Sequence, residues 1–299
     1  MNDKHDIKAG LSCMVVTFFI WGFQPFYWNL GQNLDTMFLM LWRICTAAVF
    51  CLILLKIQGK LKQLKDAFKN KAVLKREIPA AFFLAIDWFV YLYAVKAGRV
   101  QEVSFGYYLM PVVIFSFGAF VYKEKIRTAH ILVLVLVAAG IIASFKGFGE
   151  FPWVALTLSC AFAVYSAIKK GITEDGVVTT TMEILMMFPF ALLFLLIFYR
   201  GESGLSSMSW RDILFVAGAG LVTCVPMFFY SLGVNRLSMF TTALCHYISP
   251  TLSIICSLIL GEELTSGKLI SFAFIWLGII VYTVDFSNKI KEENKEELK

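Results

Sequence analysis

The sequence predicts an all-α integral membrane protein with ten transmembrane helices in two inverted five-helix repeats. The first observation is composition: of 299 residues, 59% are hydrophobic, 16% are charged, and the mean hydropathy is +0.74. A soluble domain carries about 25% charged residues, so an ordinary water-soluble fold is excluded. The second observation is that the apolar residues gather in long segments, each near the ~20 residues that cross a bilayer. The third is an internal repeat, described below.

The apolar segments are separated mostly by short connections, which leave no room for a soluble domain. The longest connection, 56–77, is basic and amphipathic, and we expect it to lie on the membrane surface. Lys4 and Lys8 precede the first segment, but its length and the lack of a cleavage site favour a retained helix over a signal peptide. The predicted spans are 8–30, 35–57, 78–97, 101–122, 127–145, 151–169, 178–199, 210–234, 238–260 and 266–286.

The Lys and Arg residues between the spans are unevenly distributed. With the N-terminus in the cytoplasm, most of them fall on the cytoplasmic side, as the positive-inside rule requires. We therefore expect a multi-pass protein of the cell membrane with both termini in the cytoplasm. The partners that this implies are the lipid bilayer and a small-molecule substrate, with a second copy of the chain in a homodimer as a further candidate.

Two stretches, 91–124 and 230–263, share identical residues at a fixed offset of 139. Because five spans is an odd number, the two halves would cross the membrane in opposite directions. Doubled, inverted units of this kind are typical of secondary transporters, with the substrate near the midplane between the repeats. We divide the chain into a first repeat, 1–145, a second repeat, 146–287, and a charged cytoplasmic tail, 288–299. The matched pairs are Tyr91 and Tyr230, Val95 and Val234, Tyr108 and Tyr247, Pro111 and Pro250, and Glu124 and Glu263.

The prolines of this repeat lie near the middle of the fourth and ninth predicted spans. A proline leaves the carbonyl four residues earlier without its helical partner, and these carbonyls belong to Tyr107 and His246. Such carbonyls are tolerated at membrane depth only against protein or a water-filled cavity. The prediction is a pair of broken helices lining a central cavity; two packing kinks are the alternative. The candidate cavity residues are Trp21, Gln24, Asp87, Tyr91, Tyr107, Tyr108, Pro111, His246, Tyr247 and Pro250.

Among the ionisable residues inside predicted spans, we single out Asp87, Arg43 and Glu183. A charge in the membrane is costly and usually functional or paired. Asp87 could bind a cationic group or carry a proton, or stay neutral in a hydrogen bond. Arg43 and Glu183 lie at opposite depths, so each would snorkel or pair locally, with a substrate role for Arg43 as the alternative. With His246, Asp87 and Arg43 are the candidates for charge or proton coupling.

Three further acids lie at span ends: Glu102, Glu124 and Glu263. We expect them to stabilise helix ends or bond loops. The seven cysteines all lie in apolar segments without metal-ligand spacing, so no metal is expected. The chain has no phosphate-binding loop and no hydrolase motif, so neither an enzyme nor a cofactor is predicted. The distribution of the basic residues also argues against nucleic-acid binding.

Specific stretches resemble a known family over nearly the whole chain. They are FIWGFQP at 19–25, Arg43, EVSFGYYLMP at 102–111, Lys169 and Lys170, Glu183, VTCVP at 222–226, HYISPTL at 246–252, GE at 261–262 and FAFIW at 272–276. With these the chain resembles the drug/metabolite transporter superfamily, specifically its EamA-type members of the RarD kind. The resemblance implies an amide where this chain has Asp87.

The resemblance implies two inverted five-helix repeats and an inner-membrane permease that exports drugs or small metabolites, driven by an ion gradient or by the substrate's own gradient. The alternatives are a proton-linked or facilitative importer and, in a different class, a non-transporting membrane partner or a membrane enzyme.

Overall fold

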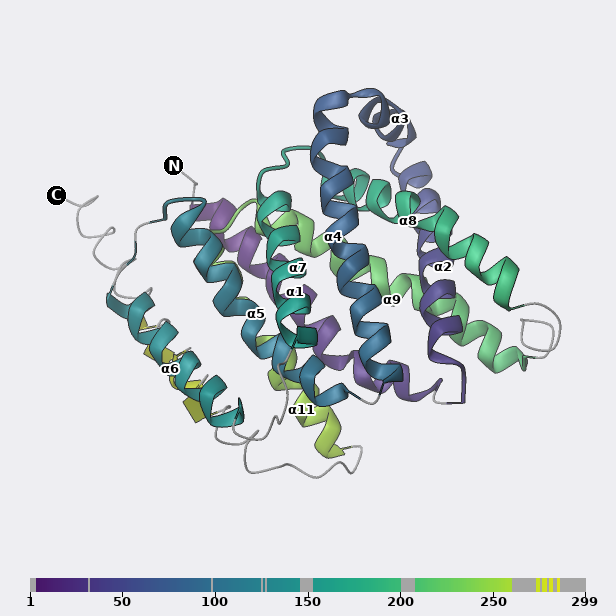
Figure 1. Ribbon diagram of the computed structural model, residues 1–299. Coiled ribbons are helices and arrows are strands. Elements are labelled where there is room, and N and C mark those ends of the chain that lie inside the picture. Colours follow the sequence, from purple (N-terminus) through teal and green to yellow (C-terminus); the bar gives the residue numbers. More distant parts are fainter. Residues whose placement is uncertain are drawn as a thin grey trace.

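The structure is a computed structural model (Figure 1). It describes residues 4–31, 33–97, 99–124, 126, 128–145, 153–199, 208–259 and, within the last predicted span, 273, 274, 276–278, 280, 281, 284 and 285. All regular secondary structure in these residues is helical, which confirms the all-α prediction. Glu263 and the tail 288–299 lie outside the described residues, as does most of the span predicted at 266–286.

The helices follow the predicted spans closely. Within the described residues, five helices contain stretches long and apolar enough to cross a membrane: α1, α2, α4, α8 and α9. Their bounds are α1 Lys4–Asn29, α2 Thr36–Ile57, α3 Leu61–Lys69, α4 Lys71–Lys96, α5 Val100–Phe120, α6 Thr128–Phe145, α7 Trp153–Lys170, α8 Gly176–Phe198, α9 Trp210–Val234, α10 Met239–Cys245 and α11 Ile248–Ile259.

The connection predicted at 56–77 is the main difference. It contains the short amphipathic helix α3, but α4 begins seven residues before the predicted span, so Glu77 lies inside a helix rather than in a loop. Pro79 lies inside α4, in its third turn, where it removes one backbone N–H from the hydrogen-bond pattern of the helix.

Side-chain caps fix the start of several helices. The Oδ1 atom of Asp35 accepts a hydrogen bond from Phe38 N at the start of α2, and Asp175 accepts from two backbone N–H groups at the start of α8. Ser209 and Ser238 cap α9 and α10 in the same way. These residue types accept bonds from the first unpaired N–H groups of a helix.

The two prolines of the repeat behave differently, which corrects the expectation of two broken helices. Helix α5 runs without interruption through Pro111. The equivalent span of the second half is broken: α10 ends at Cys245, and α11 begins at Ile248. Pro250 lies in the first turn of α11, where its missing N–H costs no hydrogen bond.

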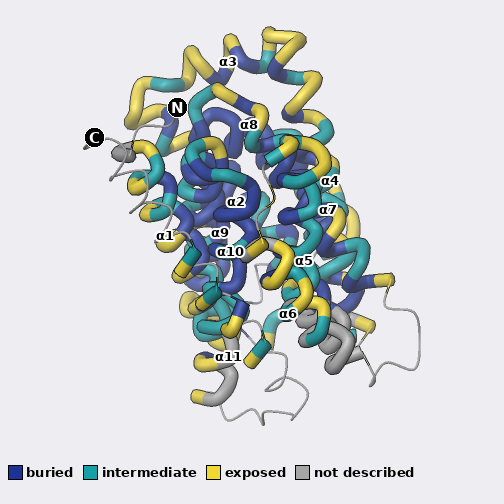
Figure 2. Tube along the Cα trace, turned by 90° about the vertical axis from the view of Figure 1, so that its left-hand side faces the viewer, coloured by how far each residue is buried: buried dark blue, intermediate teal, exposed yellow. Residues whose placement is uncertain are grey.

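Helices of the two halves alternate in space. Helix α7 packs on α4 and α5, and α9 packs on α1 and α2, while α1 also contacts α11 and α4 contacts α8. Figure 1 shows α3 at one end of the bundle, which we call the α3 end. Figure 2 shows that buried residues gather along the inside of the bundle and that α3 is largely exposed.

Candidate functional site

Arg43 of α2 lies in a box of aromatic side chains. Its guanidinium carbon is 4.3 Å from the ring centre of Trp88 and 5.8 Å from that of Trp28. Asp87, Tyr91 and Tyr107 are ionisable neighbours of Arg43. A cation over an aromatic face gains about 2 kcal/mol or more when water is excluded. We call Trp28, Arg43, Asp87, Trp88, Tyr91 and Tyr107 the Arg43 cluster.

The two charged residues of the Arg43 cluster are buried but incompletely bonded. Arg43 is 9% exposed and Asp87 is 5% exposed. Among the described residues, Nε of Arg43 and Oδ1 of Asp87 have no hydrogen-bond partner. Arg43 therefore does not snorkel, and it pairs with aromatic rings. Seven residues separate it from the start of α2, which places it about 10 Å from the end of the bundle opposite α3.

Gln24 and Trp21 of α1 connect the Arg43 cluster to the second half of the chain. The Nε2 atom of Gln24 donates to the carbonyl oxygen of Val222 at 3.1 Å, and Trp28 Nε1 donates to Gln24 Oε1 at 3.5 Å. The ring of Trp21 lies 5.7 Å from that of Tyr230 in α9. Both candidates therefore lie where the two halves meet.

His246 lies in the break between α10 and α11. Its ring is 4.4 Å from Phe18 and 5.8 Å from Tyr230. It is 6% exposed, and its Nε2 atom has no hydrogen-bond partner among the described residues. Apolar and aromatic neighbours of this kind favour a neutral imidazole, because burial disfavours the charged form.

The offset of 139 recurs in the packing of rings. Tyr91 and Tyr107 lie 6.4 Å apart, and the residues 139 positions later, Tyr230 and His246, lie 5.8 Å apart. The first pair joins α4 and α5, and the second joins α9 to the end of α10. Both halves thus place an aromatic pair between equivalent elements.

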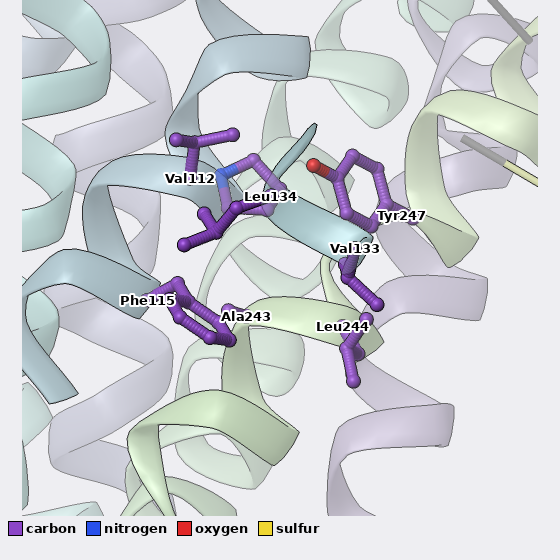
Figure 3. Close-up of a pocket in the computed structure, with 8 residues that line it drawn as sticks. Val112, Phe115, Val133, Leu134, Ala243, Leu244 and Tyr247 are labelled. Carbon is purple, nitrogen blue, oxygen red and sulfur yellow. The ribbon is translucent and has the colours of Figure 1, made fainter. Parts of the chain in front are cut away.

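Tyr108, Pro111 and Tyr247 are held apart from the Arg43 cluster. Pro111 and Tyr247 line a small apolar hollow with residues of α6 and α10, in which the ring of Tyr247 stands beside Val133 (Figure 3), and Tyr108 packs against the same side chains. The structure thus separates these three residues from Asp87 and Tyr91, while Tyr107, beside Tyr91, is 36% exposed. The hollow is lined by Pro111, Val112, Phe115, Val133, Leu134, Ala243, Leu244 and Tyr247.

A second polar cluster was not predicted from the sequence. Nζ of Lys169 in α7 lies 2.7 Å from Oε1 of Glu183 in α8 and 3.9 Å from Oε1 of Glu77 in α4. Lys169 also donates to Thr179 Oγ1 at 2.9 Å, and the Tyr165 hydroxyl donates to Glu183 Oε2 at 3.1 Å. We call Glu77, Tyr165, Lys169, Thr179 and Glu183 the Lys169 cluster. Glu183 thus pairs locally, which was one of its two predicted alternatives.

The helix-end acids have separate roles. Glu124 accepts hydrogen bonds from Met239 N at 2.7 Å and Phe240 N at 3.2 Å. It therefore caps α10 in the other half of the chain rather than the helix that follows it. Glu102 lies in the first turn of α5. No group of three His, Cys, Asp or Glu side chains in the described part of the chain could hold a metal ion.

Comparison with known proteins assigns the family. The sequence profile described as "EamA-like transporter family" matches twice, over residues 8–146 and 152–284. An uncharacterized transporter of Bacillus subtilis, YojE, is 32% identical over 93% of this chain and 94% of its own length. Protein RarD of Escherichia coli is 26% identical over 95% of this chain and 96% of its own length. These matches confirm the family resemblance that the sequence motifs predict.

A solved structure supports the fold alone. It is 17% identical and covers 94% of this chain and 96% of that chain, with a TM-score of 0.68. Together with the apolar helices, the family match makes this protein a multi-pass membrane transporter. The chain belongs to the EamA-like transporter family.

Proposed function

We propose that the chain is a secondary transporter that exports small metabolites or drugs, with the Arg43 cluster as its substrate site. The observation that carries the proposal is a buried cation and a buried carboxylate that both keep unbonded polar atoms inside an aromatic box. An unsatisfied buried charge costs several kcal/mol. A site that binds a polar ligand recovers part of that cost whenever the ligand is present.

The chemistry of the Arg43 cluster suits a small molecule with both polar and flat apolar parts. Arg43 offers donors and Asp87 offers an acceptor, while Trp28, Trp88 and the two tyrosines offer ring faces. Binding sites commonly combine mostly apolar walls with a few placed polar groups. Gln24, which bonds across to Val222, ties this site to the second half of the chain.

Alternating access between two inverted repeats is part of the proposal. Each helix of the first half has a counterpart in the second: α1 and α7, α2 and α8, α4 and α9, and α5 and α10–α11. The packing follows the same correspondence, because α4 packs on α7 as α9 packs on α1, and α5 packs on α7 as α11 packs on α1. The two matches of one family profile support the same division of the chain. With the N-terminus in the cytoplasm, the α3 end is cytoplasmic and the Arg43 cluster lies in the outer half of the membrane.

Transport in cells and in vesicles tests the proposal. Cells that lack the protein should accumulate the substrate inside, and purified protein in proteoliposomes should move it with and without a pH gradient. Depletion inside those cells would instead indicate an importer. Asp87→Asn should change the transport rate or its pH profile, whereas Glu124→Gln, far from the cluster, should leave both near the original values. An unchanged rate and pH profile for Asp87→Asn would contradict a role for its charge.

Two neighbouring tyrosines provide a test of the site itself. In a variant whose exposed Cys160 and half-buried Cys13 are replaced, we expect Tyr107→Cys to react with a small polar thiol reagent and to be protected by the transported substrate. Tyr108→Cys is the matched control, since Tyr108 packs with the α6 side chains. Equal labelling of both positions would argue against the Arg43 cluster as the site.

A further inference from the structure

Three buried charges meet near the α3 end of the bundle. Lys169 is 1% exposed, and Glu77 and Glu183 are fully buried. The ammonium group of Lys169 lies 2.7 Å from Glu183 and 3.9 Å from Glu77. Two carboxylates therefore share one positive charge in a place that water does not reach.

Glu77 is the carboxylate of this cluster that has no hydrogen bond. Neither of its oxygens has a hydrogen-bond partner among the described residues. Lys169 donates one hydrogen bond to Thr179, and Glu183 accepts a hydrogen bond from the hydroxyl of Tyr165. Glu183 and Glu77 lie 2.7 Å and 3.9 Å from the same ammonium nitrogen, and two carboxylates can bond to each other only through a proton.

Lys169 is the positive group whose charge acts on Glu77 among the described residues. On α4, Arg76 donates to the carbonyl oxygen of Gly171. On α7, Lys170 lies 3.9 Å from Glu124. The segment before α8 adds Glu174, whose negative charge acts on Glu77, and Asp175, which pairs with Lys60. On α9, the Tyr230 hydroxyl donates to Ser166.

A buried excess of one negative charge is strongly unfavourable, and two close carboxylates cannot both ionise cheaply. We propose that Glu77 and Glu183 form a proton-binding site that holds one shared proton while the α3 end is closed and releases it to water when that end opens. The proton neutralises the excess charge and completes the missing hydrogen bond of Glu77. The opening step rests on the proposed transport function, whereas the proton site does not.

Infrared spectroscopy of the full chain in lipid nanodiscs tests the proton directly. We expect wild-type protein at neutral pH to show the carbonyl stretch of a protonated carboxylic acid. Glu77→Gln should abolish the signal, because Glu183 then pairs alone with Lys169. Glu183→Gln should abolish it too, although Glu77 is still present, because one carboxylate then faces one ammonium. Loss in both single variants is the mark of a shared proton, which a purely structural role would not produce.

Two variants control this measurement. Asp87→Asn removes the buried acid of the Arg43 cluster, and Glu124→Gln removes an acid that caps α10; both should keep the signal. Unchanged helical content and a single elution peak show that each variant is folded. A signal that survives in Glu77→Gln or in Glu183→Gln, or that is absent from wild-type protein, would overturn the shared proton.

The link to opening needs a second readout. Ser166 is fully buried on α7, three residues before Lys169, and Ser166→Cys is a conservative probe. After correction for the ionisation of a free thiol, its labelling should rise with pH in otherwise wild-type protein and should be independent of pH with Glu77→Gln. Labelling that is independent of pH in both would overturn the gating step. Because the infrared signal needs no transported substrate, its result is independent of the transport assay.

Discussion

The Nζ atom of Lys169 lies 2.7 Å from Oε1 of Glu183, and both side chains are almost wholly shielded from solvent. The pair joins the last turn of α7 to the first half of α8, and Glu77 attaches α4 to the same point. Removing two ions from water is expensive, so such a pair is worth little relative to apolar packing. Replacing only one partner, however, leaves the other charge buried and unpaired, which strongly destabilises the protein.

Lys169→Met should destabilise the protein by about 3–5 kcal/mol, because it leaves two buried carboxylates without a cation. Thermal unfolding in detergent measures this as a lowered Tm. In a protein that also carries Glu77→Gln and Glu183→Gln, the same substitution should lower the Tm much less. Lys170→Met is the matched control, because its side chain is 17% exposed and lies 3.9 Å from its acid. Equal losses for both lysines would contradict the burial argument.

Glu124→Ala should destabilise the start of α10 by about 1 kcal/mol, the usual cost of a lost helix cap. The carboxylate accepts from two N–H groups of α10 and so ties the end of α5 to the second half of the chain. Glu124→Gln keeps an acceptor oxygen and should lose less. Hydrogen exchange at Met239 and Phe240 reports the effect locally, and unchanged protection in Glu124→Ala would refute the cap.

Gly220→Ala should separate α2 from α9. A Cβ atom at this glycine would lie 2.3 Å from the backbone N of Ala47 and 2.3 Å from the carbonyl carbon of Thr46. Backbone cannot yield as a flexible side chain does, so we expect a loss of about 1–3 kcal/mol, as for other overpacked sites. Gly171→Ala is the control, since its nearest contact would be an ordinary 3.5 Å. A Tm for Gly220→Ala equal to that of the control would show that the helices are not so close.

Helix content, span positions and the family were all accessible from the sequence, because apolar runs and motif residues are local signals. The Lys169 cluster was not, because its members lie on three helices and the sequence does not show which of them meet. Glu77 follows a run of charged residues, so the sequence places it in a loop, whereas in the structure α4 begins at Lys71 and contains it. Pro111 and Pro250 have the same local pattern, yet only the second half breaks near its proline. Packing around each helix decides that difference.

Asp175 provides a pH-dependent prediction outside the membrane spans. Burial raises the pKa of its carboxyl, but hydrogen bonds from Lys60 and from the N–H groups of Val178 and Val177 lower the pKa more, so it lies below its usual value. A lowered folded-state pKa stabilises the protein above the unfolded value of about 3.9, and the gain is lost as pH falls through the folded value.

Asp175→Asn keeps an oxygen that can cap α8 but removes the charge that meets Lys60 at 2.7 Å. Because both side chains are about a third exposed, we expect a loss at neutral pH of no more than about 1 kcal/mol. The difference in Tm from wild type should shrink as the pH is lowered below 4, because the wild-type carboxylate then becomes protonated. Asp66→Asn, on the exposed side of α3, should show no such convergence. A Tm difference for Asp175→Asn that grows in acid would reverse the sign of this linkage and rule out a stabilising carboxylate at the start of α8.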